Sequence, residues 1–421
     1  RQRERFLELN NLYAMNDVVD VVSNDLHVVQ QGNKLEVISE LRVRNPHPQP
    51  LDTLIFSLNP GFVIDSITDR DGQVDYIRTE QIIRILPTRE IASGRGSRFS
   101  FHYRGKPNES VAYLDIPREQ VEALKRIQVA TVDKKSGIVH ENYMLLTPEL
   151  LWYPMAGVGF NLITFQPQEM DFVRFSLTVN PAEGLTAIAP GKMAQIEDQV
   201  EFIPENDLNS LALVIGPLEK RSREIEGVEY NLFLKPGHDF FSKYFTNITD
   251  TLDILIKEAK DDYEMDELDL YYPFERINLV EVPIQFHAYE RPYIQTVENI
   301  LPEMILLPEK GAGINTLDFA RFKRAEERRD RDRENQRSPR EIETDQFKRF
   351  LQNTFFRSGT TTRSRGFGGG GEGGEELITF QGGSNYTKNP YCVFPLYYSY
   401  VTGISSKQYP VFNSMMELYL K

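Results

Sequence analysis

A change in the period of hydrophobic residues near position 17 constrains the fold of this chain more than any other feature. In residues 1–16, apolar side chains recur at helical spacing among charged ones, which predicts a helical lead-in. From there on, apolar and polar residues alternate, and strict alternation places every second side chain on the same face of a β-strand. The clearest examples are Leu35, Val37, Leu41 and Val43, then Phe99, Phe101 and Tyr103, and then Val173, Phe175, Leu177 and Val179.

Turn-forming residues separate these alternating runs. The clearest clusters are Asn45-Pro46-His47-Pro48, Asn59-Pro60-Gly61 and Asn180-Pro181-Ala182-Glu183-Gly184. Short strands between such turns, each with one apolar face, are typical of an antiparallel sheet that packs one side against a core. Residues 17–218 are therefore predicted to form an antiparallel β domain, interrupted by a short helical insert at 119–126.

The second half of the chain has a mixed α/β pattern. Apolar residues recur at helical spacing over 238–260, which predicts an amphipathic helix. A strand-like run follows over 276–283, and 390–421 is predicted to form two helices or a helix and a loop. The fold class we expect is β followed by α/β, with the antiparallel β domain over 17–218 and an α/β domain over 219–421.

Composition excludes several classes of partner and site. The formal net charge is −14 and the isoelectric point is about 5.1, whereas nucleic acid and anionic lipid require a basic surface. The single cysteine, Cys392, excludes an internal disulfide framework. No apolar run approaches the roughly 18 residues that predict a membrane-spanning helix.

A charged and glycine-rich segment, roughly residues 325–378, is predicted to be a partly disordered insertion. Residues 321–350 contain 11 Lys or Arg and 8 Asp or Glu, and Gly368 to Gly374 are all glycine except Glu372. Mixed charge of this kind is typical of a solvated helix and loop, and phosphate binding by the basic residues is the alternative. The glycines do not form a phosphate-binding loop, because no Gly-Lys-Ser or Gly-Lys-Thr closes them.

The histidines show no zinc-binding pattern. They are His27, His47, His102, His140, His238 and His287, and no two of them are four positions apart. The His-Glu-x-x-His helix, which places two zinc ligands on one face, is therefore absent from the sequence. No Gly-x-Ser-x-Gly elbow for a serine nucleophile is present either. Taken singly, the histidines are interpreted as structural or surface residues.

A set of motifs, taken in chain order, resembles the aminopeptidase N family of gluzincin zinc metallopeptidases. In that family a saddle-like antiparallel β domain precedes a thermolysin-like α/β domain. The latter carries a strand with Tyr-Pro and Leu-Val, then Gly-x-Met-Glu-Asn, then His-Glu-x-x-His and a third zinc ligand. The corresponding residues here are Tyr272-Pro273, Leu279-Val280, Gln295 to Asn299 and the ending Phe412 to Leu420. The resemblance implies the same order of domains, with the thermolysin-like domain truncated in this chain.

The resemblance assigns a substrate-binding role to the stretch that follows the strand. In the family this motif holds the N-terminus of the substrate, and the positions here are Gln295, Val297, Glu298 and Asn299. A carboxylate such as that of Glu298 pairs with a cationic α-amine. The alternative is a surface or helix-start glutamate, which also suits a residue that follows a strand.

The metal positions of the family are degenerate in this chain. Aligning the ending without gaps places the three zinc ligands on Tyr391, Pro395 and Ser414, and the catalytic glutamate on Cys392. Tyrosine, proline and serine do not replace two histidines and a glutamate as zinc ligands. Without zinc, no bound water is acidified for attack on a peptide bond. The resemblance therefore predicts no cofactor and no catalytic residue in this chain.

The leading hypothesis is a non-catalytic, aminopeptidase-like module that binds a peptide or protein partner and no nucleic acid. Some bacterial relatives of the family are fused to membrane-embedded permease segments of ABC transporters. The resemblance, with a helical lead-in and an ending inside a predicted helix, implies a periplasmic, membrane-tethered piece of a longer protein. One alternative is an active zinc aminopeptidase whose metal site lies beyond residue 421. Another is a β-rich scaffold or adhesion domain.

Overall fold

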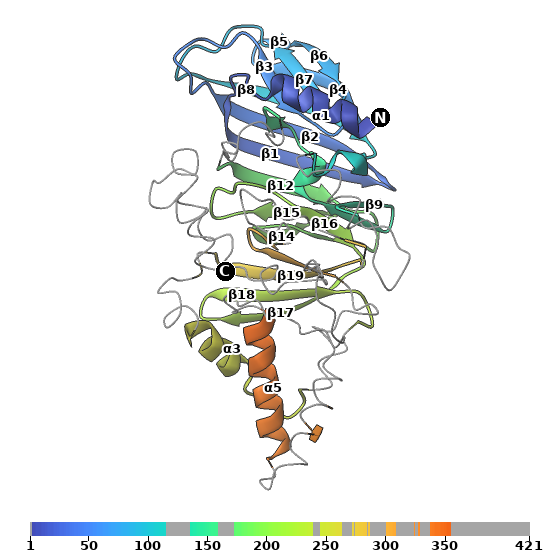
Figure 1. Ribbon diagram of the computed structural model, residues 1–421, viewed down its shortest axis with the longest axis vertical. Coiled ribbons are helices and arrows are strands. Elements are labelled where there is room, and N and C mark those ends of the chain that lie inside the picture. Colours follow the sequence, from blue (N-terminus) through green and yellow to red (C-terminus); the bar gives the residue numbers. More distant parts are fainter. Residues whose placement is uncertain are drawn as a thin grey trace, which may run out of the picture.

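The computed structural model describes residues 2–114, 135–158, 172–238, 245–262, 272, 274–283, 285–286, 300–308, 324, 327–328 and 337–354. This part of the chain is mostly β-sheet with few helices, and its sheets follow one another along the long axis of the molecule (Figure 1). The β-rich character predicted from the alternating pattern is confirmed. The predicted helical insert at 119–126 and the predicted helices of 390–421 lie outside the described residues. No helix in the described ranges is both long and apolar enough to span a bilayer.

An eight-stranded sheet forms the first half of the molecule. Its order is β14 (Lys192–Ile196), β15 (Gln199–Ile203), β12 (Arg174–Asn180), β1 (Asp20–Gln31), β2 (Lys34–Arg44), β8 (Gly96–Gly105), β4 (Phe62–Asp69) and β5 (Gly72–Gln73). The expected alternation is present, since Leu35, Val37, Leu41 and Val43 of β2 are buried. One pairing departs from the expected antiparallel sheet, because β1 and β12 run parallel. Alternation tells which face a residue occupies but not in which direction the neighbouring strand runs.

Two smaller antiparallel sheets pack beside the large one. The first has the order β13 (Thr186–Ile188), β16 (Leu213–Gly216), β10 (Tyr143–Leu146) and β9 (Ile138–His140). The second has the order β11 (Met155–Ala156), β3 (Leu54–Ser57), β7 (Ile82–Leu86) and β6 (Asp75–Thr79). Two 3₁₀ turns, Glu109–Val111 and Pro148–Leu150, lie in the connections.

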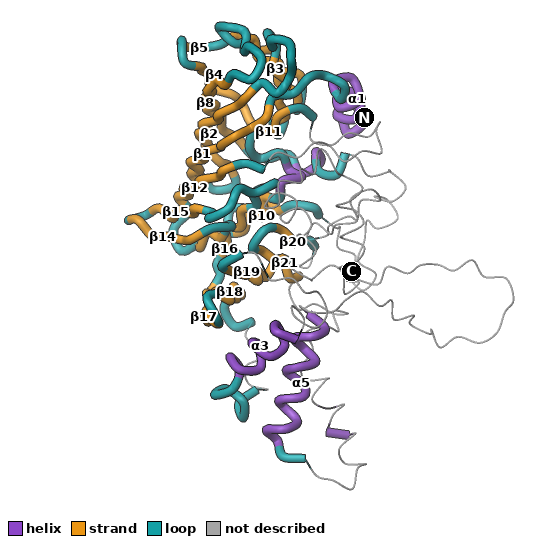
Figure 2. Tube along the Cα trace, turned by 90° about the vertical axis from the view of Figure 1, so that its left-hand side faces the viewer, coloured by secondary structure: helices purple, strands orange, loops and turns teal. Residues whose placement is uncertain are grey.

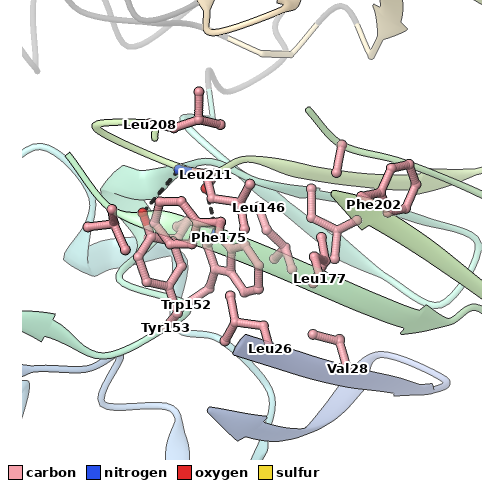
Figure 3. Packing of buried hydrophobic residues seen from close by; sticks show 14 of the residues in the cluster. Leu26, Val28, Leu146, Trp152, Tyr153, Phe175, Leu177, Phe202, Leu208 and Leu211 are labelled. Carbon is pink, nitrogen blue, oxygen red and sulfur yellow. Dashed lines mark hydrogen bonds between the residues drawn. The ribbon is translucent and has the colours of Figure 1, made fainter. Parts of the chain in front are cut away.

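Aromatic side chains fill the core between these sheets. Figure 3 shows Trp152 and Tyr153 packed between the strand that carries Leu26 and the segment that carries Leu211. Both aromatic residues are satisfied by one backbone position, because Trp152 Nε1 donates to the Leu211 carbonyl at 3.2 Å and the Leu211 N–H donates to the Tyr153 hydroxyl at 3.1 Å. The edge-to-face contact of Trp152 with Tyr153, at 4.9 Å between ring centroids, adds to the burial of their apolar surface.

A five-stranded mixed sheet forms the second half. Its order is β17 (Glu219–Ile225), β18 (Val228–Leu234), β19 (Arg276–Val282), β21 (Met304–Pro308) and β20 (Ile300–Leu301). The strand predicted over 276–283 is confirmed as β19, and every one of its residues is buried. The strands β18, β19 and β21 are parallel, whereas β17 and β20 pair antiparallel at the two edges.

The sheet of β10 and β16 is a middle layer that joins the two halves. Met144 and Leu146 of β10 belong to the core that contains Trp152. Their neighbours Tyr143 and Leu145 belong to a second core with Phe233, Val280, Val282 and Leu306 of the five-stranded sheet. Because successive side chains of a strand point to opposite faces, the sheet is apolar on both sides and packs between the other two. The two halves therefore share a continuous hydrophobic interior.

Three helices cover the ends of this stack. Helix α1 (Gln2–Tyr13), within the predicted lead-in, buries Phe6 and Leu9, and the Gln81 side chain donates to the Phe6 carbonyl at 2.7 Å. Helix α3 is shorter than the predicted helix over 238–260, since it spans only Leu252–Asp261. The turn before it contains Asn, Thr and Asp, whose side chains compete for backbone hydrogen bonds and favour turns over helix.

Helix α5 (Pro339–Thr354) lies inside the segment that was predicted to be partly disordered, and that prediction is wrong for this stretch. Its start is a capping box, in which Glu341 N–H donates to Ser338 Oγ at 3.3 Å and Ser338 N–H donates to a Glu341 oxygen at 2.7 Å. Figure 2 shows α5 beside α3. The Phe347 ring packs edge-to-face on Phe245, with 5.3 Å between centroids.

This packing generates a test of how α5 is held. Replacing Phe347 by Ala removes its contact with Phe245, and we expect a loss of about 3 kcal/mol in the local stability of α5. Hydrogen exchange of the α5 backbone amides is the measurement, with Lys348→Ala, an exposed neighbour, as the matched control. Equal protection of the amides in both variants would show that the aromatic contact does not hold the helix.

Candidate functional site

The stretch that the resemblance assigned to substrate binding lies outside the described residues, and so do the degenerate metal positions. These residues are Gln295, Val297, Glu298 and Asn299 for substrate binding and Tyr391, Cys392, Pro395 and Ser414 for the metal. Their assignment stays a prediction. The described chain resumes at Ile300, the first residue of β20, directly after Asn299.

The carboxyl ends of the parallel strands β18, β19 and β21 meet at one edge of the five-stranded sheet. In the register, Leu279 of β19 pairs with Leu232 of β18 and Ile305 of β21, so the three strands end side by side. Because β20 runs antiparallel to β21, its first residue, Ile300, is the one nearer that edge. Open α/β sheets place their binding sites outside the carboxyl ends of parallel strands. This edge is therefore the candidate site.

A carboxylate and an imidazole form a pair at this edge. Glu281 lies near the end of β19 with its side chain only 4% exposed, and its Oε1 is 2.6 Å from Nδ1 of His238, whose side chain is 37% exposed. The other oxygen of Glu281 accepts the backbone N–H of Lys235 at 2.7 Å. A buried carboxylate held in this way fixes the orientation of the imidazole beside it. The pair thus presents a partly exposed ring whose position is set by β18 and β19.

Tyr143 of the middle sheet closes the pair from the inside. Its hydroxyl donates to the backbone carbonyl of Glu281 at 2.8 Å, and the Lys235 ammonium lies 5.8 Å from the centre of its ring. The contacts with the tyrosine tie the candidate edge to β10, so the site is built from both halves of the molecule. Chemically, the arrangement provides hydrogen-bonding groups and one orienting carboxylate.

A second charged cluster lies at the opposite end of β19. Arg276, the first residue of the strand, makes a two-pronged contact with Glu205, in which Nη1 and Nη2 each donate at 2.6 Å. Nη1 also lies 3.0 and 3.1 Å from the two oxygens of Glu303 in the β20–β21 turn. Glu205 follows β15, so the cluster ties the eight-stranded sheet to the five-stranded sheet.

The two carboxylates of this cluster have opposite electrostatic environments. The hydrogen bonds from Arg276 lower the pKa of Glu205, which is partly exposed. Burial raises the pKa of Glu303 to about 7, against the opposing effects of Arg276 and the Gly191 N–H. One guanidinium charge cannot neutralise two carboxylates, so the more exposed one keeps the ion pair and the buried one holds its proton more tightly.

Local backbone geometry places Glu303. It adopts φ of +58°, and the Asn278 N–H donates to its carbonyl at 2.7 Å. A side-chain oxygen of Glu303 accepts the Gly191 N–H at 2.7 Å. Gly191 has φ of +103° and a Cβ there would lie 2.4 Å from the Pro204 nitrogen, so this close approach requires glycine.

The donor groups available do not fit the zinc that the family resemblance implies. No three histidine, cysteine, aspartate or glutamate side chains in the described ranges come together as a metal site. At the positions that the sequence register assigns to the metal, the residues are Tyr391, Pro395 and Ser414. Proline has no donor atom on its side chain, and neutral tyrosine and serine hydroxyls are not the ligands that zinc takes in proteins. No reaction step through zinc follows from this chain.

Sequence reasoning missed both groups of interacting residues. The pair His238 and Glu281 is separated by 43 positions, and Arg276 is 71 positions from Glu205. One signal was present, because Glu281 is a charged residue between Val280 and Val282 in an otherwise apolar strand. A charge at such a position needs a partner, because burying it unpaired is costly.

The raised pKa of Glu303 predicts a pH dependence of stability. The side chain binds its proton more tightly in the folded state, so its stabilising contribution is present below pH 4.5 and is lost as the pH rises through about 7. The difference in the free energy of unfolding is on the order of 3 kcal/mol. In Glu303→Gln, which mimics the neutral acid, we expect this part of the dependence to disappear in urea titrations between pH 4.5 and 8.

The matched control is Glu275→Gln, because Glu275 lies 3.9 Å from Arg276 but its side chain is 66% exposed. We expect it to retain the wild-type dependence. An unchanged pH profile in Glu303→Gln would show that Glu303 is ionised throughout.

Comparisons with known proteins give structural neighbours at low similarity. No protein-family model matches the chain, and no curated protein matches it. The M1 zinc metallopeptidase from Deinococcus radiodurans is similar over 70% of this chain and 62% of its own, with 16% identity and a TM-score of 0.47. A variant of that protein gives 69%, 61%, 16% and 0.47 for the same four quantities. The chain thus spans about three fifths of the length of these structures, whose name is that of the family with the resembling motifs.

Proposed function

We propose that this chain is a non-catalytic, aminopeptidase-like module that binds a peptide or protein partner at the edge where β18, β19 and β21 end. The observation that carries the proposal is the pair of Glu281 and His238 at this edge. A buried carboxylate there orients a partly exposed imidazole, with 2.6 Å between the interacting atoms.

The chemistry of the edge suits an extended peptide. An imidazole can donate or accept a hydrogen bond with a peptide group, and the carboxylate that orients it removes the cost of fixing the ring on binding. Glu298 comes two positions before Ile300, where β20 begins. By the family resemblance, its carboxylate pairs with the cationic N-terminus of the partner. The proposed partner is therefore a peptide or protein segment with a free α-amine.

The absence of catalysis is proposed from the sequence. On the ungapped register, Tyr391, Pro395 and Ser414 stand at the zinc ligand positions and Cys392 stands at the position of the catalytic glutamate. Such a module would keep the binding half of an aminopeptidase site and lack the group that activates water. An active zinc enzyme with its metal site beyond residue 421 is the outcome that would replace this proposal.

The place of the module in the cell is a separate proposal. By the resemblance, it is the periplasmic part of a longer protein with permease segments in the membrane. The net charge of −14 agrees with a partner other than nucleic acid or anionic lipid. Reading the gene on both sides of the chain tests this, and flanking sequence without membrane-spanning segments would contradict it.

A peptide-binding experiment tests the proposed site. A fluorescent peptide with a free N-terminus is compared with its N-acetylated twin by anisotropy, and we expect the free amine to bind about 10- to 100-fold more tightly, as for a charge-assisted hydrogen bond. Glu298→Gln is expected to remove this preference. His238→Gln is expected to weaken both peptides about 10-fold, since a neutral hydrogen bond is lost.

The matched control is His102→Gln, because His102 is an exposed histidine of β8, far from the edge in the order of strands. We expect it to bind both peptides as the wild type does. Equal binding of both peptides by every variant would contradict the site. Stoichiometric zinc by metal analysis, together with chelator-sensitive hydrolysis of a fluorogenic aminopeptidase substrate, would contradict the non-catalytic role.

A further inference from the structure

A small cavity lies where the eight-stranded sheet meets the five-stranded sheet. Its volume is about 20 Å³. Its apolar wall comes from residues such as Ala189 and Phe202, and its polar wall comes from Asn231, Arg276 and Asn278. The cavity borders the cluster in which Arg276 contacts Glu205 and Glu303, but no carboxylate of that cluster lines it.

Two buried polar atoms on the lining residues lack a hydrogen-bond partner among the described residues. They are Arg276 Nε, which can only donate, and Asn231 Oδ1, which accepts. The two residues are 5% and 3% exposed. Their other groups are engaged, since both Nη atoms of Arg276 bind carboxylates and Asn231 Nδ2 donates to Asn278 Oδ1 at 2.9 Å. One unsatisfied donor and one unsatisfied acceptor thus border the same space.

We propose that this cavity binds one internal water molecule, which accepts a hydrogen bond from Arg276 Nε and donates one to Asn231 Oδ1. A cavity of about 20 Å³ is enough for one water, which needs roughly 10–15 Å³ and two to four polar partners. The Ala189 carbonyl is a third candidate partner, because its present bond from Asn278 Nδ2 is long, at 3.5 Å.

Charge distinguishes water from an ion at this site. A cation would lie beside the Arg276 guanidinium, which repels it. An anion would accept from Arg276 Nε but would face the Asn231 oxygen and the Glu229 carboxylate, both of which also lining residues contribute. Only a neutral molecule with both donor and acceptor groups satisfies the two atoms at once, and at this size that molecule is water.

The water would complete the bonding of Arg276. The guanidinium then uses Nη1 and Nη2 for the carboxylates and Nε for the water, so each of its nitrogens has a partner. The water links β18 to β19 at the end of the strand that carries the ion pairs between the sheets. This inference does not rest on the proposed binding function, which concerns the opposite end of β19.

A crystal structure of the wild-type chain tests the proposal directly. We expect an ordered water about 2.7–3.2 Å from both Arg276 Nε and Asn231 Oδ1. A second crystal soaked in sodium bromide separates water from a halide, and we expect no anomalous peak at this position. A cavity closed by a changed side-chain rotamer, a cavity without density, or a bromide peak would each overturn the proposal.

A variant pair tests whether the two atoms hold the water. Asn231→Leu keeps a similar volume and removes the acceptor, so we expect the water to be lost. Lys220→Met changes another lining residue and leaves both atoms in place, so we expect the water to remain. Retention of the water in Asn231→Leu would overturn the proposed bridge. If Asn231→Leu does not fold, the wild-type structure still decides the question.

Discussion

The burial of one small sheet on both of its faces determines how the rest of this molecule is arranged. In β10, Met144 faces the aromatic core around Trp152, and its neighbour Leu145 faces the core of the five-stranded sheet. A sheet that is apolar on both sides is stable only between two other layers. The eight-stranded and five-stranded sheets provide those layers. The position of β19, and with it both polar groups at its ends, follows from this stacking.

The sequence predicted the outline of this fold because alternation and turn residues are local signals. Alternation identified β2 and its buried residues, and the apolar run after Pro273 identified β19. The parallel pairing of β1 with β12 could not be predicted in this way, since a strand's pattern is the same for either direction of its neighbour. The middle layer was also hidden, because a strand buried on both faces shows no alternation.

Composition concealed the helix that the sequence analysis missed. Mixed charges dominate the segment around α5, and they were interpreted as a sign of a solvated, partly disordered region. The signals for order were few and specific: Ser338 and Glu341 at capping-box spacing, Pro339 at the first helical position, and Phe347 on the inward face. Three residues outweigh the average character of the segment because a helix end and one aromatic contact are set by particular atoms.

The polar groups at the two ends of β19 could not be predicted from sequence because their partners are distant along the chain. Between them the strand is buried, with Val280 and Val282 completely inaccessible to solvent. A charge in such a strand is tolerated only where a partner meets it, and each partner comes from a different element: His238 from after β18, Glu205 from after β15. The ion pairs of Arg276 therefore do more than offset burial. They are satisfied in only one alignment of the two sheets, and that alignment also sets the edge at which Glu281 orients His238.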